Sequence, residues 1–166
     1  MTFHLAPYDV RADHLTEHLA SEFERLIRAV ESAKGFQLLI AQFNQQHYRD
    51  LYTTRLAAIQ ADTRVLYVER ENIVDTSQLR VRVHELAKSN AVIHIMECNI
   101  WQVEWIRALN QQRERLSCPA VVIFWFTADL LKQFALQAPD LWSWRSGVFD
   151  FTVQAKVDSL NPSCYQ

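Results

Sequence analysis

The chain has 166 residues, of which 49% are hydrophobic, and a formal net charge of -2 at pH 7. With only two glycines and four prolines, this composition excludes a low-complexity or linker protein and predicts one compact domain. Nucleic acid is not expected as a partner, because its binding depends on concentrated positive charge. No apolar stretch approaches the ~20 residues needed to cross a bilayer, and no signal segment is recognisable, so no membrane association is expected.

Three cysteines are present, at Cys98, Cys118 and Cys164. An odd number is typical of unpaired thiols in a reducing compartment, so a cytoplasmic location is expected. A disulfide between Cys98 and Cys118 would contradict the fold predicted below, because the two would lie at opposite edges of a sheet. We expect a single α/β domain over residues 1–155 and a C-terminal tail over 156–166.

The first half of the chain alternates between helical and extended patterns. Apolar residues recur every three or four positions over 13–33, which predicts one helix with a single buried stripe, closed by Gly35. Strands are expected over 36–43 and 64–69, and helices over 45–61 and from Ser77 onward.

The second half continues the alternation. The continuous apolar run over 120–126 is typical of a strand in a parallel sheet that is covered on both faces. Thr127 is expected to cap the next helix, and Gly147 to end a short turn before the last strand. The remaining elements are strands over 91–98 and 148–153 and a helix over 99–116.

Five short strands that alternate with helices predict a three-layer α/β fold, a mostly parallel sheet with helices on both faces. The strand, helix and strand within 119–151 form a βαβ unit, whose crossover is right-handed in nearly all proteins.

Ligands of such sheets bind beyond the carboxyl ends of the strands. After the first strand the chain reads Asn44, Gln45, Gln46 and His47, without the glycines and lysine that a phosphate-binding loop requires. The only glycines of the chain, Gly35 and Gly147, cannot form a glycine-rich nucleotide motif. The sequence therefore excludes the usual Walker-type phosphate loop.

Other candidate residues have a structural explanation beside the functional one. Glu97 follows the third strand, where a carboxylate could hold Mg²⁺, but an acid at a strand end is common. Thr127 follows the fourth strand and could contact a ligand, although helix capping explains it. His14 and His18 could face one metal ion, but no third ligand is in view, which favours a solvated surface.

Two further side chains are more consistent with packing than with chemistry. Cys118 follows an arginine-rich segment that could lower its pKa, yet a buried strand begins directly after it, which favours an inert thiol. His94 lies within an apolar strand and is predicted to be a hydrogen-bonded core residue. Since no nucleophile–base set or G-x-S-x-G elbow can be assembled, a non-enzymatic role is favoured.

The segment 141–147 has the most unusual local composition, with Trp142, Trp144 and Arg145. In a structural interpretation the indoles cover an edge of the sheet and Arg145 stacks on one of them. In a functional interpretation they form a partner-binding surface, since Trp and Arg dominate interface hot spots.

The helix over 106–116, the strand AVVIFWF and the segment APDLWSWRSGVF over 138–149 together resemble a known bacterial domain. That domain stands at the N-terminus of multidomain proteins, often ahead of tetratricopeptide repeats, and is similar to inactive STAND-class P-loop NTPases that lack phosphate-binding motifs. The resemblance is close over about 91–151 and general, strand for strand, over 15–69.

This resemblance implies a P-loop-type core in sheet order 5-1-4-3-2. Asn44 and His47 would stand where active relatives have the phosphate loop, and Glu97 with Cys98 where they have an acidic pair for Mg²⁺. The expected function is a non-catalytic regulatory or scaffolding module that binds proteins in signalling, without cofactor or metal. Self-association through the Trp-rich segment is a subsidiary hypothesis.

Two alternatives stay open. One is an atypical nucleotide-binding protein or NTPase, in which Glu97 holds Mg²⁺ and Arg145 or His47 meets phosphate. The other is an unrelated small hydrolase or transferase, because a fold does not fix a function.

Overall fold

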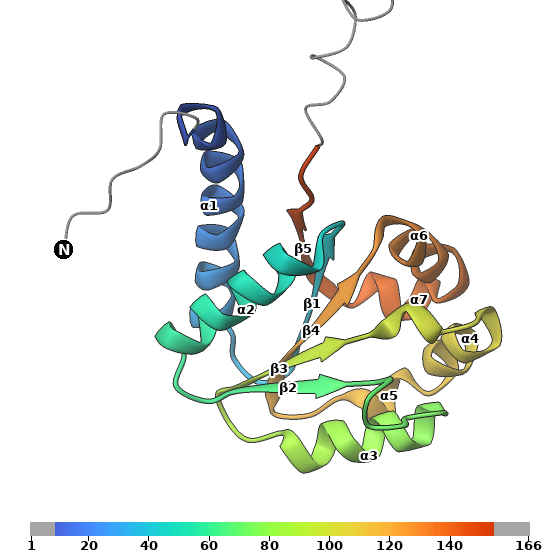
Figure 1. Ribbon diagram of the computed structural model, residues 1–166. Coiled ribbons are helices and arrows are strands. Elements are labelled where there is room, and N and C mark those ends of the chain that lie inside the picture. The colour runs from blue at the N-terminus through green and yellow to red at the C-terminus, as the bar shows by residue number, and fades with distance from the viewer. Residues whose placement is uncertain (1–8, 155–166) are drawn as a thin grey trace, which may run out of the picture.

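The centre of the protein is a five-stranded, all-parallel sheet in the order β2-β3-β4-β1-β5 (Figure 1). The computed structural model describes residues 9–154, with side chains from residue 17 onward; the tail predicted over 156–166 lies outside them. The α/β class and the strand order are therefore confirmed. The strands are β1 (Gln37–Phe43), β2 (Thr63–Tyr67), β3 (Ala91–Met96), β4 (Ala120–Phe126) and β5 (Arg145–Phe151).

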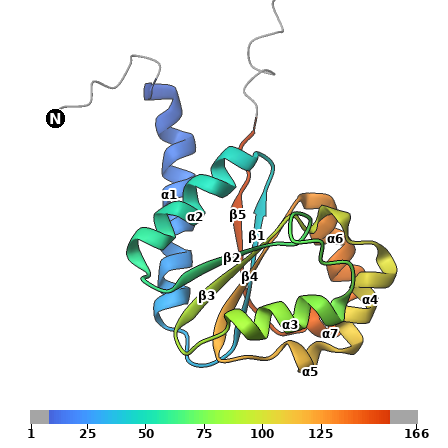
Figure 2. The same ribbon diagram turned by 60° about the horizontal axis from the view of Figure 1, so that its bottom comes forward.

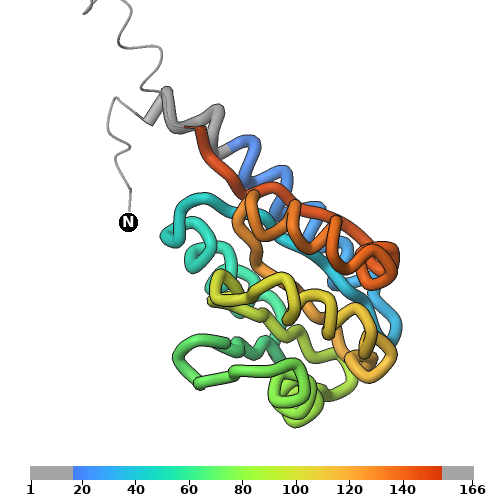
Figure 3. Tube along the Cα trace, turned by 90° about the vertical axis from the view of Figure 1, so that its right-hand side faces the viewer, coloured from blue at the N-terminus to red at the C-terminus, as the bar shows by residue number. Residues whose placement is uncertain are grey.

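Helices cover both faces of the sheet. The connection from β1 to β2 runs across the sheet in the opposite direction to the later connections, so right-handed crossovers place α2 on one face and the later helices on the other. Figure 2 shows α1 with α2 on one side and α3 to α7 on the other, and Figure 3 shows α3, α4 and α6 side by side. The helices are α1 (Asp9–Glu31), α2 (Gln46–Ile59), α3 (Thr76–Leu86), the 3-10 turn η1 (Cys98–Ile100), α4 (Val103–Gln111), α5 (Arg113–Leu116), α6 (Ala128–Gln137) and α7 (Pro139–Ser143).

An aromatic cluster forms the core beneath α3 to α7. The rings of Phe124 and Phe126 are stacked with centroids 5.4 Å apart, and Phe134 of α6 lies 5.0 Å from Phe126. Trp101 packs edge-on against Phe124 at 5.5 Å. Aromatic packing of this kind adds to the hydrophobic stabilisation of a core.

The core beneath α1 and α2 is mixed in character. Tyr52 of α2, Trp125 of β4 and Phe151 of β5 form a ring cluster with centroids 5.1 and 5.3 Å from Phe151. Arg49 and Thr53 of α2 and His94 of β3 are also buried. The α1–α2 side therefore contains most of the buried polar side chains of the described residues.

Both outer edges of the sheet are capped by side chains. At β5, the Glu22 carboxylate accepts from the Asp150 amide at 2.8 Å, and Arg25 of the same helix donates to a β5 carbonyl at 3.4 Å. At β2, the Glu71 carboxylate accepts from the Tyr67 amide at 2.8 Å, while the Glu71 amide donates to the Tyr67 carbonyl. Capping of this kind protects edge strands from pairing with other chains.

The prediction of one continuous helix over 99–116 is wrong. The chain instead forms η1, passes through an extended residue at Trp101, and divides the rest into α4 and α5. The break places Trp101, only 6% exposed, against the aromatic core, whereas the neighbouring Ile100 is 42% exposed. Burial of the larger side chain explains why the helical pattern is interrupted.

Two element boundaries also differ from expectation. Gly147 was expected to end a turn before the last strand, but it lies within β5, where an added Cβ would meet the Phe149 ring at 3.0 Å. The helix predicted over 45–61 ends at Ile59, whose side chain is 53% exposed. Gly35 has φ +72°, as expected for a left-handed turn after a helix.

Candidate functional site

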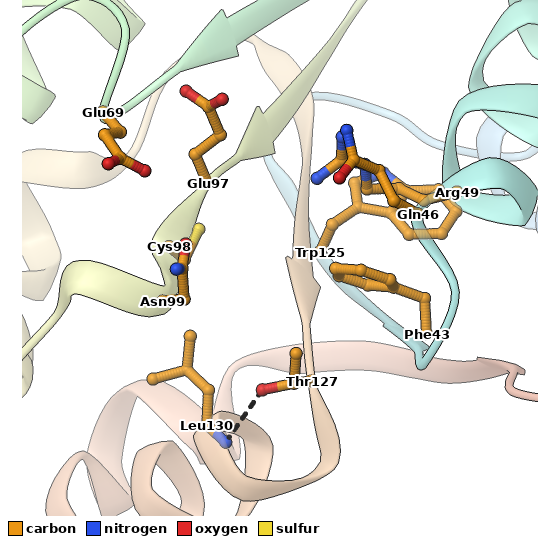
Figure 4. A pocket seen from close by; sticks show the side chains of 10 residues that line it. All are labelled: Phe43, Gln46, Arg49, Glu69, Glu97, Cys98, Asn99, Trp125, Thr127 and Leu130. Carbon is orange, nitrogen blue, oxygen red and sulfur yellow. Dashed lines mark hydrogen bonds between the residues drawn. The ribbon is translucent and has the colours of Figure 1, made fainter.

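A cavity of about 290 Å³ lies at the carboxyl edge of the sheet, where the sequence predicted a ligand site. Residues that follow β1, β2, β3 and β4 meet there with the first turns of α2 and α6 (Figure 4). The lining residues are Phe43, Gln46, Arg49, Glu69, Glu97, Cys98, Asn99, Trp125, Thr127 and Leu130.

The turn between β1 and α2 consists of Asn44 and Gln45 alone. The Asn44 side chain is fully used in holding the chain after β5, since its Nδ2 donates to the Val153 carbonyl at 2.6 Å and its Oδ1 accepts from the Val153 amide at 2.9 Å. His47 is exposed and packs edge-on against Tyr48 at 4.4 Å. Neither predicted residue lines the cavity.

Glu97 does line the cavity, and it has the left-handed conformation, with φ 62°. Its Oε1 accepts from the Arg70 amide at 3.0 Å and its Oε2 from Arg70 Nε at 2.9 Å. Both oxygens therefore fix the turn after β2. Positive φ is uncommon outside glycine and marks a constrained position.

Thr127 caps α6 as predicted, because its hydroxyl oxygen accepts from the Leu130 amide at 3.4 Å (Figure 4). Thr127 also lines the cavity. Its hydroxyl proton is not used by the cap and can be donated to an acceptor.

Arg49 and Glu69 line the cavity but were not predicted as site residues from the sequence. Arg49 is the buried one of the two. It is only 4% exposed, with its guanidinium carbon 5.3 Å from the centre of the Phe43 ring. Its Nε donates to one oxygen of Asp50 at 2.9 Å, and its Nη2 forms an ion pair with the same oxygen at 2.9 Å. A signal was present, because Arg49 lies four and seven positions before the inward-facing Thr53 and Leu56.

Cys98 also lines the cavity. Burial raises the pKa of Cys98 well above its ordinary value, and the positive charge of Arg49 offsets this only in part. A thiol kept protonated is a poor nucleophile. Cys118 is likewise buried, which raises its pKa, and both thiols are free, so the predicted absence of a bond between them is confirmed.

His94 is a hydrogen-bonded core residue, as predicted. The indole Nε1–H of Trp125 donates to His94 Nδ1 at 2.9 Å, so the imidazole proton is on Nε2, which has no partner in the described structure. Complete burial lowers the pKa of His94 to about 3. The imidazole is therefore neutral at physiological pH and separated from solvent.

No group of three or more His, Cys, Asp and Glu residues among the described side chains could hold a metal ion. His18 is exposed on α1, and the side chain of His14 lies outside the described part of the chain. Within residues 9–154, no helix has both the length and the apolar character needed to cross a membrane.

The Trp-rich segment is divided between two elements. Trp142 belongs to α7, and Arg145 opens β5, stacks on the Trp142 ring at 4.1 Å and donates from Nη1 to its carbonyl at 2.8 Å. Trp144 packs edge-on against Phe36 at 6.3 Å. Both indoles are half-buried and Arg145 is exposed, so part of each ring remains accessible.

No family model matches the chain, and no curated protein matches it significantly in sequence.

Proposed function

We propose that the protein is a non-catalytic regulatory or scaffolding module, built on a degenerate P-loop NTPase-like fold of the inactive STAND type. The two-residue turn between β1 and α2 carries this proposal. A phosphate loop needs a longer, glycine-rich segment whose amides converge on an anion. Here the turn is too short, and Asn44 is bonded to Val153.

The second feature in support is the engagement of Glu97. Both of its carboxylate oxygens accept hydrogen bonds from Arg70. A Mg²⁺ ligand of a nucleotide hydrolase must instead present a carboxylate to the metal or its waters. The atypical nucleotide-binding alternative would require Glu97 to exchange these bonds for metal coordination.

Protein partners would meet side chains rather than free strand edges, because β2 and β5 are capped. The exposed parts of Trp142, Trp144 and Arg145 supply residue types that dominate interface hot spots. Self-association through this surface is the subsidiary proposal. Sedimentation velocity at increasing concentration tests it, and a strictly monomeric profile at the highest concentration would contradict it.

The experiment for the main proposal is a calorimetric titration with ATP, ADP and GTP, each with and without Mg²⁺. We expect no saturable heat at millimolar nucleotide. A Kd tighter than about 0.1 mM, equivalent to about 5.5 kcal/mol, would favour the nucleotide-binding alternative. Glu97→Ala would then abolish any Mg²⁺ dependence if this carboxylate holds the metal.

A further inference from the structure

The cavity at the carboxyl edge has two walls of opposite charge. Arg49 and Gln46 of α2 lie on one wall, and Glu69 and Glu97 lie on the other (Figure 4). Among the described residues, no ion pair joins the two walls, because Arg49 pairs with its neighbour on α2 and Glu97 with Arg70. Opposite charges that remain apart across a cavity can each bind the oppositely charged group of a ligand that carries both a positive and a negative charge.

Arg49 has the properties of a carboxylate-binding group. A guanidinium has five N–H donors, and here Nε donates to one Asp50 oxygen, with which Nη2 forms an ion pair. Within the described structure nothing accepts from Nη1. Arginine binds carboxylates in a bidentate manner, and such bonds are stronger in a buried site than in water. The start of α2, which has no side-chain cap, adds a favourable partial positive charge.

The opposite wall offers a carboxylate that has no partner in the described structure, that of the exposed Glu69. Its negative charge suits an ammonium group. Glu97 strengthens the negative potential of this wall while its oxygens remain bonded to Arg70. Between the walls, Trp125 and Leu130 provide apolar contact and the Thr127 hydroxyl can donate.

The size of the cavity narrows the class of ligand. At about 290 Å³ it lies at the small end of the ~300–1,000 Å³ that is usual for ligand sites. We propose that the cavity binds a small zwitterion, whose carboxylate contacts Arg49 and whose ammonium group contacts Glu69. This inference goes beyond the scaffolding role and does not depend on it, because it rests on the cavity residues alone. Binding of such a ligand would make the protein responsive to a metabolite.

A series of ω-amino acids tests the proposal by calorimetry on the full chain: glycine, β-alanine, γ-aminobutyrate, δ-aminovalerate and ε-aminocaproate. We expect saturable binding with one optimal length, because the two charged groups must span a fixed gap. Butyrate and butylammonium carry one charge each and should bind about 10- to 100-fold more weakly than that optimum, as expected for the loss of a hydrogen bond to a charged group. Equal binding of a single-charge probe, or no binding of any zwitterion at millimolar concentration, would overturn the proposal.

Two variants test the contribution of each cavity wall to ligand binding. Arg49→Met and Glu69→Gln should each weaken binding of the optimal amino acid by about 10- to 100-fold, while Arg55→Gln, an exposed arginine on the same helix, should leave it unchanged. Because Glu69 is exposed, Glu69→Gln remains informative even if the Arg49 variant fails to fold. Unchanged affinity in Glu69→Gln would contradict the assigned wall, whatever nucleotide titrations show about the scaffolding role.

Discussion

The two faces of the sheet differ in what they bury. Beneath α3 to α7 the core is aromatic and aliphatic, and the buried polar side chain on that side is Thr76. Beneath α1 and α2, the same kind of core includes Arg49, Thr53 and His94. Burying a polar group without a partner costs free energy. This cost arises on both sides, at His94 Nε2 beneath α1 and α2 and at Trp101 Nε1 and Arg80 Nε on the side of α3 to α7.

The cavity adjoins the second face. Arg49 and Trp125 belong to the α1–α2 side and also line the cavity. Buried charged residues are often neutral or unfavourable for stability, and groups of this kind concentrate at functional sites. The proposed carboxylate contact, Arg49, therefore lies on the α1–α2 side, whereas the proposed ammonium contact, Glu69, follows β2.

The largest effect is expected from the aromatic face. Phe134→Ala removes a fully buried ring that contacts Phe124, Phe126 and Trp142, so we expect the free energy of unfolding to fall by about 3–5 kcal/mol. Urea denaturation measures this value. The control Leu136→Ala lies on the same helix and is 63% exposed, so it should change the free energy of unfolding by less than about 0.5 kcal/mol. Similar losses in both variants would show that the Phe134 ring does not make the expected contribution to the core.

An intermediate effect is expected from His94, as a dependence on pH. The folded state lowers the pKa of His94 from 6.5 to about 3, so between these values the unfolded chain binds more protons than the folded chain. Stability is therefore present above the unfolded pKa and falls as the pH decreases through this window, by about 2 kcal/mol from pH 7 to pH 5.

Urea denaturation at the two pH values tests this loss. The variant His94→Gln keeps an acceptor for the Trp125 indole and removes the titrating group. Its difference between the two pH values should be smaller by about 2 kcal/mol, whatever its absolute stability. An unchanged difference would assign the acid sensitivity to other groups.

The smallest effect on stability is expected from Arg49→Met. The substitution keeps a long apolar stem and removes a buried charge, so the free energy of unfolding should change by less than about 1 kcal/mol. Chemical denaturation of this variant, set beside its loss of ligand affinity, sharpens the contrast between the faces. A loss of unfolding free energy as large as that of Phe134→Ala would show that Arg49 contributes as much to stability as the aromatic core does.

The five strands and their alternation with helices could be predicted because continuous apolar runs and helical periodicities differ clearly along the chain. The strand order was implied only by the family resemblance, because local patterns do not show which strands are neighbours. The absence of a phosphate loop also followed directly from the residues after Phe43. Arg49 could not be recognised with the same ease, since an arginine among polar neighbours usually indicates a solvated helix face. Its burial depends on Phe43 and Asp50 meeting it in three dimensions.

The interruption of the helix after Glu97 was equally difficult to predict from the sequence. Residues 99–116 have a helical pattern, yet Trp101 interrupts it and packs against Phe124 and Phe126. Local periodicity contains no information about rings that lie more than twenty positions away. The hydrogen bonds between Glu97 and Arg70 could not be foreseen from the sequence for the same reason.

The position of β1 has a consequence for how the chain folds during synthesis. β1 is made early but pairs only with late strands, Gln37 with Val121 of β4 and Phe43 with Phe151 of β5. Contacts between such distant segments slow folding, because the loop entropy is lost before the contacts form. A nascent chain that ends before β4 exposes the apolar β1 without a strand to pair with, which is the period when it most needs protection by a chaperone.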